Sequence, residues 1–276
     1  MKLSLIVIIL THNESIHIER AIKNVDGWAD KIIVLDSYSD DDTPEKAKAL
    51  NVEFIARKFD NYKNQREYAI QYAKDQAEWL FFLDADEYLT EELKSEIKTA
   101  IKKPDIVGYY LPRRFIFMNK WIRWGGYYPT YLLRLFRPEQ ASLDRVINEH
   151  VTVLGHKDYL KHDFIDHNLK GISNWIDKHN RYATYEAVDL MACKKSPMET
   201  KIPSKKMGKQ WLRYNIWNKL PIIIVRPVVY FIYRYFFRLG FLDGKEGLIY
   251  HFLQGFWFWF VIDVKYFELK KNKCVE

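Results

Sequence analysis

The chain contains little cysteine, and this scarcity excludes several classes of protein. Only Cys193 and Cys274 occur among 276 residues. Two isolated cysteines provide neither the ligand spacing of a structural zinc site nor a disulfide framework. A disulfide-stapled secreted scaffold is therefore excluded, and a reducing cytoplasm is the expected compartment.

Long hydrophobic runs are also missing. No uninterrupted apolar stretch reaches the roughly 20 residues that span a bilayer. The nearest, residues 247–262, contains His251 and Gln254. Near the N-terminus the run LSLIVIIL is short and is followed by THNE instead of a small-residue cleavage site. We therefore interpret it as a buried first strand and expect neither a signal peptide nor a membrane span.

Aromatic residues and positive charge, in contrast, are plentiful. The chain has 9 Trp, 19 Tyr and 17 Phe, and its formal net charge is +7. Such aromatic content suits sugar stacking or a membrane interface. The positive charge favours anionic partners such as nucleotides, nucleic acid or acidic lipid headgroups. The length is sufficient for one large domain, or for one domain with an extension.

Short apolar runs alternate with helical patterns through the first hundred residues. This alternation predicts an α/β domain with a mainly parallel sheet flanked by helices. In such sheets ligands bind at the carboxyl ends of the strands, so the polar residues that follow each run are candidates for a site. The expected strands cover residues 3–10, 31–35, 52–56 and 79–83.

The stretch WLFFLDADE runs from apolar residues straight into the carboxylates of Asp84, Asp86 and Glu87. Carboxylates this close repel one another unless a cation lies between them. A hard divalent ion such as Mg²⁺ or Mn²⁺, shared with substrate phosphates, meets that need. The alternative is a strand followed by an acidic helix cap, because residues 90–93 are typical of a helix start. We favour the site.

Four motifs in order carry a resemblance to a known family. They are THNES, VLDSYSDDDT, the QREYAI helix and LDADE, and three later segments add to them: GGYYPTYLLRLFRP, VINEHV and FLDGKEGLIYHFLQGFW. Together they resemble the inverting glycosyltransferases of family 2, especially the bacterial lipopolysaccharide-core and capsule glucosyltransferases. The resemblance implies a GT-A fold, a UDP-sugar donor, a Mg²⁺ or Mn²⁺ cofactor, and a lipid-linked or lipopolysaccharide glycan as acceptor.

The resemblance also assigns roles to individual residues of this chain. Asp36 would bond the uracil ring, although many relatives have a second acidic residue at the position of Ser37. Asp84 and Asp86 match the DxD pair, with Asp86 the better metal ligand and Asp84 nearer the ribose. As isolated residues, several of these could instead cap a helix or a turn, or lie on a solvated face. The full nucleotide-binding set implied is Thr11, Asn13, Glu14, Asp36, Ser37, Arg66 and Asp84.

Arg134 lies on a predicted strand at residues 132–136. An arginine near a nucleotide diphosphate neutralises the leaving group. We therefore add Arg134 to the nucleotide-sugar site; the alternative is a solvated arginine on an edge strand.

Inversion at the sugar also requires a base that deprotonates the acceptor hydroxyl. The family places an acidic residue there, often as V-H-E, where this chain has Ile147-Asn148-Glu149. We expect Glu149 to be the base, with His150 in reserve. The alternative is a buried structural pair of a glutamate with an arginine.

The chain changes character near residue 195. We predict a GT-A catalytic domain over 1–195 and a basic, aromatic extension over 196–276. Within the extension, Arg226, Arg234 and Arg238 interrupt an apolar run, which suits an amphipathic helix lying among anionic headgroups. This predicts a peripheral protein on the cytoplasmic face of the bacterial inner membrane. A helix packed on the catalytic domain is the alternative.

Two other function classes remain open. A nucleotidyltransferase also combines an α/β sheet with carboxylate-bound metal, but it usually has a Gly-rich phosphate loop, which THNES is not. A non-catalytic basic module could bind membrane or nucleic acid. Clustered carboxylates at strand ends oppose binding to a polyanion, so we expect no nucleic-acid partner.

Overall fold

The computed structural model describes residues 2–143, 151–193 and 225–272, which form two compact units. The sheet unit comprises Met1–Trp121 and Tyr128–Leu169. The helical unit comprises Ile122–Tyr127 and Lys170–Glu276. The predicted boundary at residue 195 lies outside the described residues, whereas the contacts divide the chain after Leu169.

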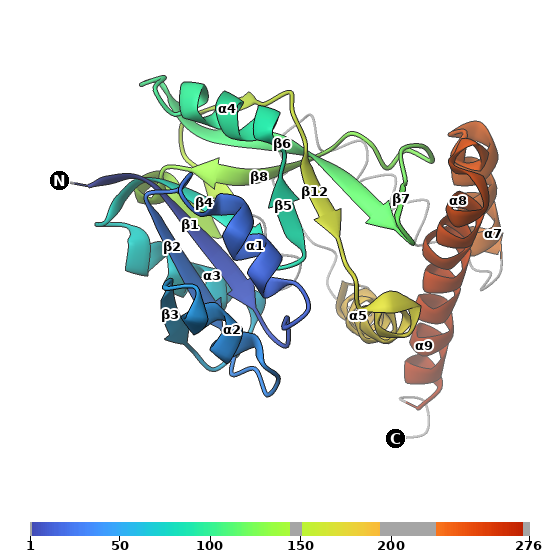
Figure 1. Ribbon diagram of the computed structural model, residues 1–276. Helices are drawn as coiled ribbons and strands as arrows, with labels where there is room; N and C mark the ends of the chain where they lie inside the picture. The colour runs from blue at the N-terminus through green and yellow to red at the C-terminus, as the bar shows by residue number, and fades with distance from the viewer. Residues whose placement is uncertain (1, 144–150, 194–224, 273–276) are drawn as a thin grey trace. The chain divides into compact units, whose positions relative to one another are not determined.

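Most strands of the sheet unit belong to one ten-stranded sheet (Figure 1). Its order is β3-β2-β1-β4-β8-β6-β12-β5, with β7 and β11 also paired to β6, while β9 and β10 form a separate ribbon. The strands are β1 (Leu3–Thr11), β2 (Lys31–Asp36), β3 (Glu53–Ala56), β4 (Ala77–Asp84), β5 (Glu87–Leu89), β6 (Ile106–Phe117), β7 (Lys120–Trp121), β8 (Thr130–Phe136), β9 (Ala141–Leu143), β10 (Val151–Val153), β11 (His156–Tyr159) and β12 (Phe164–His167).

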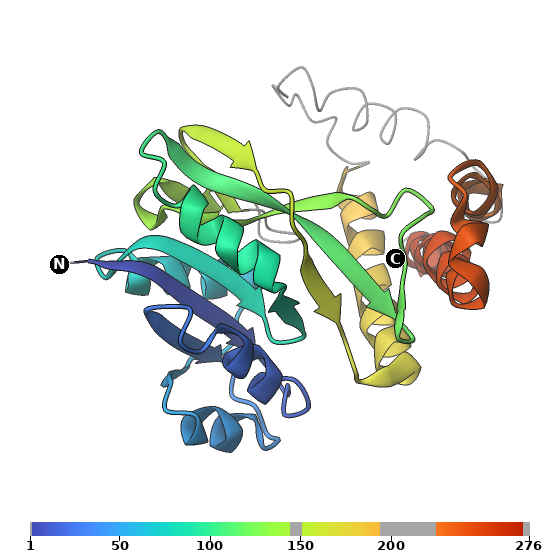
Figure 2. The ribbon, with the colours of Figure 1, turned by 45° about the horizontal axis from the view of Figure 1, so that its top comes forward.

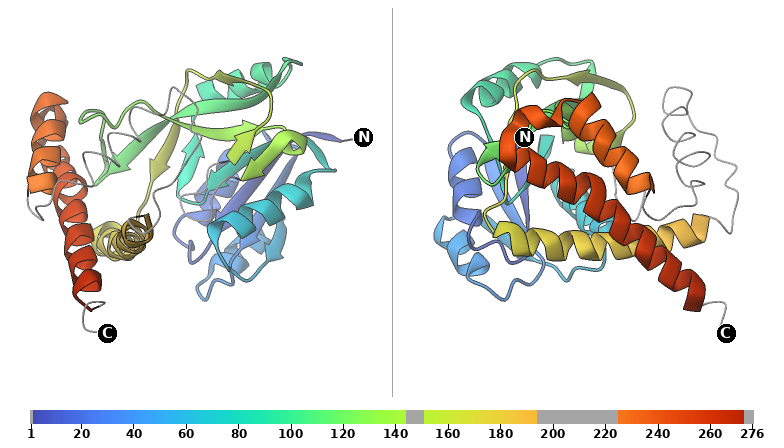
Figure 3. Two further views of the ribbon diagram at one scale, coloured as in Figure 1. Left: turned by 180° about the vertical axis from the view of Figure 1, so that it is seen from behind. Right: turned by 90° about the vertical axis from the view of Figure 1, so that its right-hand side faces the viewer.

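Helices cover both faces of this sheet, as the sequence predicts. Buried residues of α1 (Ile18–Val25), α2 (Thr43–Ala49) and α4 (Glu91–Ala100) pack on one face. Those of α3 (Tyr62–Ala73) pack on the other, which Figure 3 shows from behind. Strand β4 is buried on both faces, because Trp79 and Phe81 enter the first core and Leu80 and Phe82 the second. The predicted α/β architecture is confirmed.

The register of the central strands brings their polar ends to one edge. Strand β1 lies between β2 and β4, parallel to both, with Leu10 level with Leu35 and with Asp84. Strand β8 is antiparallel to β4 and β6, so it begins at this edge and ends at the opposite one. Figure 2 shows β12 running along β6 to the same edge.

The first helix lacks a side-chain cap. Asn13 and Ser15 are capping residue types shortly before it, yet α1 begins only at Ile18 and neither side chain caps it. The backbone N–H groups of Asn13 and Ser15 instead donate to side chains of the loop after β2, at 2.8 and 3.1 Å. Tertiary contacts to that loop have replaced the local cap. By contrast, Thr90 caps α4, where its hydroxyl accepts from the N–H of Leu93 at 3.2 Å.

The helical unit places arginines inside and aromatic residues partly outside. Arg226 and Arg234 are each only 4% exposed, so their predicted position among lipid headgroups is wrong. Arg226 pairs with Asp263, which ties α7 to α9. Long α5 packs on α9 (Figure 3, right), and Trp175 of α5 contacts Trp257 at the end of η5. The elements are α5 (Gly171–Cys193), α7 (Val225–Ile232), η3 (Tyr233–Phe237), η4 (Gly240–Asp243), α8 (Gly244–His251), η5 (Phe252–Trp257) and α9 (Phe258–Asn272).

The elements from η4 to α9 form one helical run, Gly240–Asn272. Among the described residues, it is the one helix long and apolar enough to cross a membrane by length and composition. His251 and Gln254, which interrupt the apolar sequence, do not interrupt this helical run, and His251 is buried within the helical unit.

Residues 122–127 contain a glycine-rich turn that packs against the C-terminal helices of this unit. The carboxylate of Asp243, 3% exposed, accepts from the N–H groups of Arg123 and Trp124 at 3.1 and 2.9 Å. Gly125 adopts φ +70°, and a Cβ there would lie 2.1 Å from the ring of His251. Only glycine therefore allows this close approach. The motifs WGG and FLDGKEGLIYH meet here.

We predict that Gly125→Ala destabilises the protein more than Gly171→Ala. Both glycines have positive φ, but nothing lies within 4 Å of a Cβ at Gly171. The control should therefore lose about 1–2 kcal/mol from backbone strain alone. Overpacking against His251 should cost Gly125→Ala a further 1–3 kcal/mol or so. Equal shifts of the two urea midpoints would contradict this packing.

Candidate active site

Two loops at the sheet edge hold each other through side-chain hydrogen bonds. Asn13, at φ 56°, accepts from the N–H of Asp40 through its side-chain oxygen at 3.0 Å. The N–H of Glu14 donates to the hydroxyl of Thr43 at 2.8 Å. The predicted residues Asn13 and Glu14 after β1 therefore lie beside the loop that follows β2.

Asp36 is at the centre of this pair of loops and is 1% exposed. Its carboxylate accepts the hydroxyl of Thr11 at 2.8 Å, and both the N–H and the hydroxyl of Ser39 at 2.8 and 2.5 Å. Ser37 accepts from the amide of Gln65 at 3.1 Å. Asp36 thus orders the turn, which was one of its two predicted roles, and three protein donors already occupy its carboxylate.

Asp41 shows how strongly this loop favours its carboxylates in the charged state. Burial alone would raise the pKa of Asp41, but hydrogen bonds from Thr43 and Ser15 outweigh it and lower the pKa to about 2. The loop after β2 therefore keeps this charge across the physiological range.

The three carboxylates that follow β4 point to different partners. Glu87 is 2% exposed and faces inward, where it accepts from the N–H of Asp84 at 3.0 Å. Asp84 pairs with Arg134 at 2.6 Å and with Arg66 at 3.6 Å. Asp86 lies on the turn between β4 and β5 and is only half-buried. The DADE motif therefore separates into one inner, one middle and one outer carboxylate.

Arg134 supplies the cation between the carboxylates of Asp84 and Glu87. One of its terminal nitrogens, Nη2, reaches both Asp84 and Glu87, at 2.6 and 2.5 Å, and the residue is 6% exposed. Burial alone lowers the pKa of Arg134, but the two carboxylates outweigh it and raise that pKa. Burial raises the pKa of Glu87 well above its ordinary value, against the opposing charge of Arg134. The repulsion that we expected a metal to relieve is relieved here by an arginine.

Asp86 is joined to a segment that the sequence analysis did not include in the site. The side-chain amide of Asn168 donates to its carboxylate at 2.9 Å. The N–H of His167 and the guanidinium of Arg20 donate to its backbone oxygen at 2.9 and 3.0 Å. The signal available in the sequence was the polar run Asp166-His167-Asn168, which directly follows the apolar residues Phe164 and Ile165.

The two histidines of HDFIDH contact different neighbours. His162 contacts Glu96 at 2.9 Å, whereas His167 contacts Asn119 at 3.1 Å. Burial lowers the pKa of His167, so its imidazole is neutral at physiological pH.

The residues at the edge fit a substrate-shared metal better than a cage made by protein alone. Within the described ranges, no three His, Cys, Asp or Glu side chains come together to hold an ion. Ions such as Mg²⁺ on phosphate substrates need only one or two carboxylates, with phosphate and water oxygens completing the shell. Asp86, half-buried and bonded to one amide, suits that role. Asp84 is committed to two arginines.

Of the remaining predicted site residues, the structure describes Arg66 but not Glu149 or His150. Arg66 lies beside Asp84 at this edge, as expected. Glu149 and His150 lie outside the described residues, so their catalytic role stays a prediction. Arg137, the residue just after β8, donates to the backbone oxygen of Ile106 near the opposite edge.

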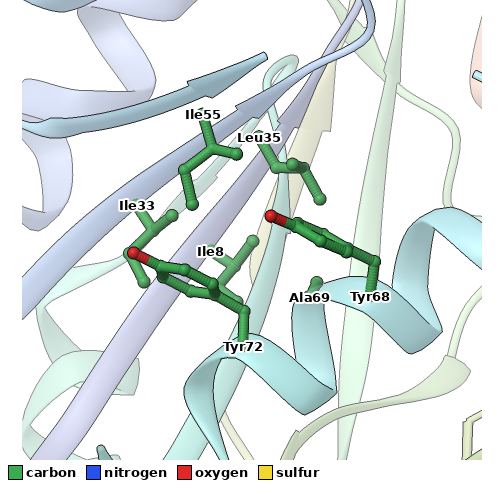
Figure 4. A pocket seen from close by; sticks show the side chains of 7 residues that line it. All are labelled: Ile8, Ile33, Leu35, Ile55, Tyr68, Ala69 and Tyr72. Carbon is green, nitrogen blue, oxygen red and sulfur yellow. The ribbon is translucent and has the colours of Figure 1, made fainter. Parts of the chain in front are cut away.

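An apolar gap elsewhere in the sheet unit carries none of this chemistry. It lies between α3 and strands β1–β3, and no charged side chain lines it (Figure 4). Its strand residues come from the middle of the strands, whereas the carboxylates lie at their ends. The lining residues are Ile8, Ile33, Leu35, Ile55, Tyr68, Ala69 and Tyr72.

Comparisons with known proteins agree with this arrangement. The profile of the family described as "Glycosyl transferase family 2" matches residues 6–160. An uncharacterised glycosyltransferase of Rickettsia prowazekii (strain Madrid E) is 28% identical in an alignment of length 265 that covers 87% of this chain and 79% of the relative. Another, of Rickettsia bellii (strain RML369-C), is 30% identical in an alignment of length 210 that covers 71% of each chain.

Among solved structures, a mannosyltransferase of Pyrobaculum calidifontis in complex with GDP-Man and Mn²⁺ is similar over most of its length. The TM-score is 0.54 at 13% sequence identity, covering 97% of this chain and 88% of that one. At this identity the likeness concerns the fold.

We predict that Arg134→Met destabilises the protein by about 3–5 kcal/mol at neutral pH, because it leaves the buried carboxylate of Glu87 without its cation, while the partly exposed Asp84 keeps Arg66. The loss should shrink as the pH falls: without Arg134 the pKa of Glu87 in the folded state rises further, so the folded state binds protons more tightly than the unfolded state. Urea unfolding at several pH values measures this. Arg137→Met is the control, since Arg137 donates to a backbone oxygen. A pH-independent loss for Arg134→Met would contradict the assignment.

Proposed function

The chain belongs to glycosyltransferase family 2 and has the GT-A fold, and we propose that it is an inverting, metal-dependent hexosyltransferase. Its donor would be a UDP-sugar, with glucose or galactose as the transferred sugar. Its acceptor would be a lipid-linked or lipopolysaccharide glycan, such as a core, capsule or O-antigen precursor, at the cytoplasmic face of the bacterial inner membrane.

The observation that carries this proposal is the meeting of three strand ends at one edge. Asn13 follows β1, Asp36 ends β2, and Asp86 follows β4, the strand on the other side of β1. A nucleotide bound across these ends would place its base and ribose at the hydrogen-bonding groups after β1 and β2, and its diphosphate at Asp86 after β4. Neither rival class explains this order: the family match leaves no reason to invoke a nucleotidyltransferase, and a non-catalytic module needs no carboxylates here.

The chain's own residues would divide the work of transfer. Loops after β1 and β2 would bind the base and ribose, while Arg134 and Arg66 hold Asp84 in place beside them. A divalent ion, when bound to Asp86 and the diphosphate, supplies positive charge to the leaving UDP. The acceptor oxygen attacks the anomeric carbon opposite the UDP, the bond from that carbon to the diphosphate oxygen breaks, and Glu149 takes the acceptor proton.

The solved structure with this fold supports the metal in the proposal and identifies a rival donor. The mannosyltransferase that shares this fold was crystallised with Mn²⁺, which favours a divalent cofactor here. Its donor is GDP-Man, so guanine nucleotides are the competing donor class. Preference for UDP in this chain rests on its resemblance to lipopolysaccharide-core glucosyltransferases.

A donor screen tests the function and the metal ligand together. Purified protein with a bacterial lipid extract should release UDP from UDP-glucose or UDP-galactose, and only with Mn²⁺ or Mg²⁺ present. Asp86→Asn should lower this rate at least about tenfold and weaken Mn²⁺-dependent UDP binding, because one charged ligand is lost. The exposed Asp105→Asn is the control. Release of GDP instead would replace the donor, and pyrophosphate release would show a nucleotidyltransferase.

Glu149→Gln tests the catalytic base. Loss of a general base costs roughly 10²–10⁴-fold in turnover, while binding of UDP and Mn²⁺ should remain near normal. Calorimetry with UDP and single-turnover transfer measure the two quantities separately. Glu139→Gln, at a half-exposed glutamate in the sheet unit, is the matched control. Near-normal transfer by Glu149→Gln would remove this residue from the role and direct attention to His150.

A further inference from the structure

The turn between η3 and α8 presents large apolar side chains to solvent. Five of the seven residues 236–242 are large, apolar and between 41% and 75% exposed, and we call them the apolar turn. It connects α7 to α8 (Figure 1). The five side chains are Phe236, Phe237, Leu239, Phe241 and Leu242.

This exposure is not explained by packing or by turn chemistry. Turns ordinarily carry Gly, Asn, Asp, Ser or Pro, and single exposed apolar residues elsewhere are normal. A contiguous exposed group instead marks a binding surface. The exposed residues Leu248 and Phe252 on the following helical elements extend the same chemistry.

The backbone under the apolar turn is held by buried polar groups. The oxygen of Arg238 accepts from the N–H of Gly125 at 2.9 Å, and the guanidinium of Arg234 donates to the oxygen of Gly125 at 3.2 Å. Asp243 accepts two further backbone N–H groups of the same loop. These hydrogen bonds fix the backbone of the turn, so its apolar side chains remain directed toward solvent. The binding surface is therefore preformed.

Charge decides which partner fits. Arg238 lies within the turn and is exposed, and the side chain of Lys245 just after it is 87% exposed. The carboxylate of Asp243 points inward and is 3% exposed. Glu246 pairs with Lys245 at 3.8 Å, but its side chain is only 22% exposed, against 87% for Lys245. The solvent-facing charge around the aromatic side chains is therefore mainly positive. Phenylalanine and leucine surrounded by arginine and lysine suit the surface of an anionic bilayer.

We propose that the apolar turn is the membrane-docking element of this protein. Phe237, Leu242 and their neighbours would enter the boundary between headgroups and acyl chains, and Arg238 and Lys245 would bind lipid phosphates. The purpose of this docking rests on the proposed function, because a lipid-linked acceptor is found at that surface. The contact itself depends only on the helical unit.

Sedimentation with vesicles tests the docking directly. The wild type should bind vesicles of phosphatidylethanolamine with phosphatidylglycerol, and bind pure phosphatidylcholine more weakly. Phe237→Ser with Leu242→Ser should lower vesicle affinity at least about tenfold, since two large apolar side chains no longer leave water. The matched control replaces Phe267 and Leu154, which are 55% and 86% exposed outside the turn, with serine. Equal binding by both double variants would overturn the proposal.

A second pair of changes tests the charge. Arg238→Gln with Lys245→Gln should weaken binding to the anionic vesicles and reduce its salt dependence, while leaving binding to phosphatidylcholine unchanged. Affinity for anionic vesicles that does not change would overturn the assignment of these two residues to lipid phosphates.

Other occupants of the surface give different results. If the turn joins two copies, light scattering will show a wild-type dimer that Phe237→Ser with Leu242→Ser converts to a monomer, with vesicle binding unchanged. If the run Gly240–Asn272 crosses the bilayer, alkaline carbonate will leave both wild type and variant in the membrane. Either result would overturn docking through the turn.

Failure of the docking and failure of the function are distinguishable. UDP release in detergent, without vesicles, reports the function alone, and the serine variant should keep it. Vesicle-presented acceptor should then reveal a loss that the detergent assay does not. A wild type that binds vesicles but releases no UDP from a sugar nucleotide with acceptor present would contradict the proposed function and leave the docking intact.

Discussion

The contact of Arg134 with Asp84 and Glu87 is the interaction on which the candidate site depends. Three carboxylates in four residues would repel one another at the end of a buried strand. A single guanidinium nitrogen reaches two of them, at 2.6 and 2.5 Å, in a nearly water-free position. At low dielectric this attraction is strong, and losing either partner leaves an uncompensated charge. The geometry of the edge follows from it.

One consequence is a division of labour among the carboxylates. Glu87 and Asp84 are used to hold the turn, so Asp86 remains as the outer group that can meet a substrate. Its position is set in turn by residues 167–168, which arrive from β12 at the far side of the sheet. A substrate-shared ion needs no more protein ligands than this. The order of strands, more than any single motif, therefore creates the site.

The helical unit shows an inverted distribution of side chains. Arg226 and Arg234 are buried and paired or bonded, whereas Phe237 and Leu242 are 75% and 51% exposed. Buried polar contacts here fix a turn around Gly125, and apolar groups that could have formed a core face outward. The proposed lipid-linked acceptor would give a physical reason to expose them, since a bilayer removes the cost of hydrating that surface.

The sequence by itself determined strands β1–β4 and β8, the polar ends of β1, β2 and β4, and the family, because alternating apolar runs and the order of motifs are local properties of the chain. It identified Asp86, Asp36 and Arg134 as members of one edge. It missed Asn168 and Arg20, whose proximity to Asp86 arises only when β12 joins the sheet. It also assigned a metal to charge repulsion that Arg134 relieves, and placed Arg226 and Arg234 among headgroups. The pairing of charged side chains depends on contacts between residues distant in sequence, and only the tertiary structure decides those contacts.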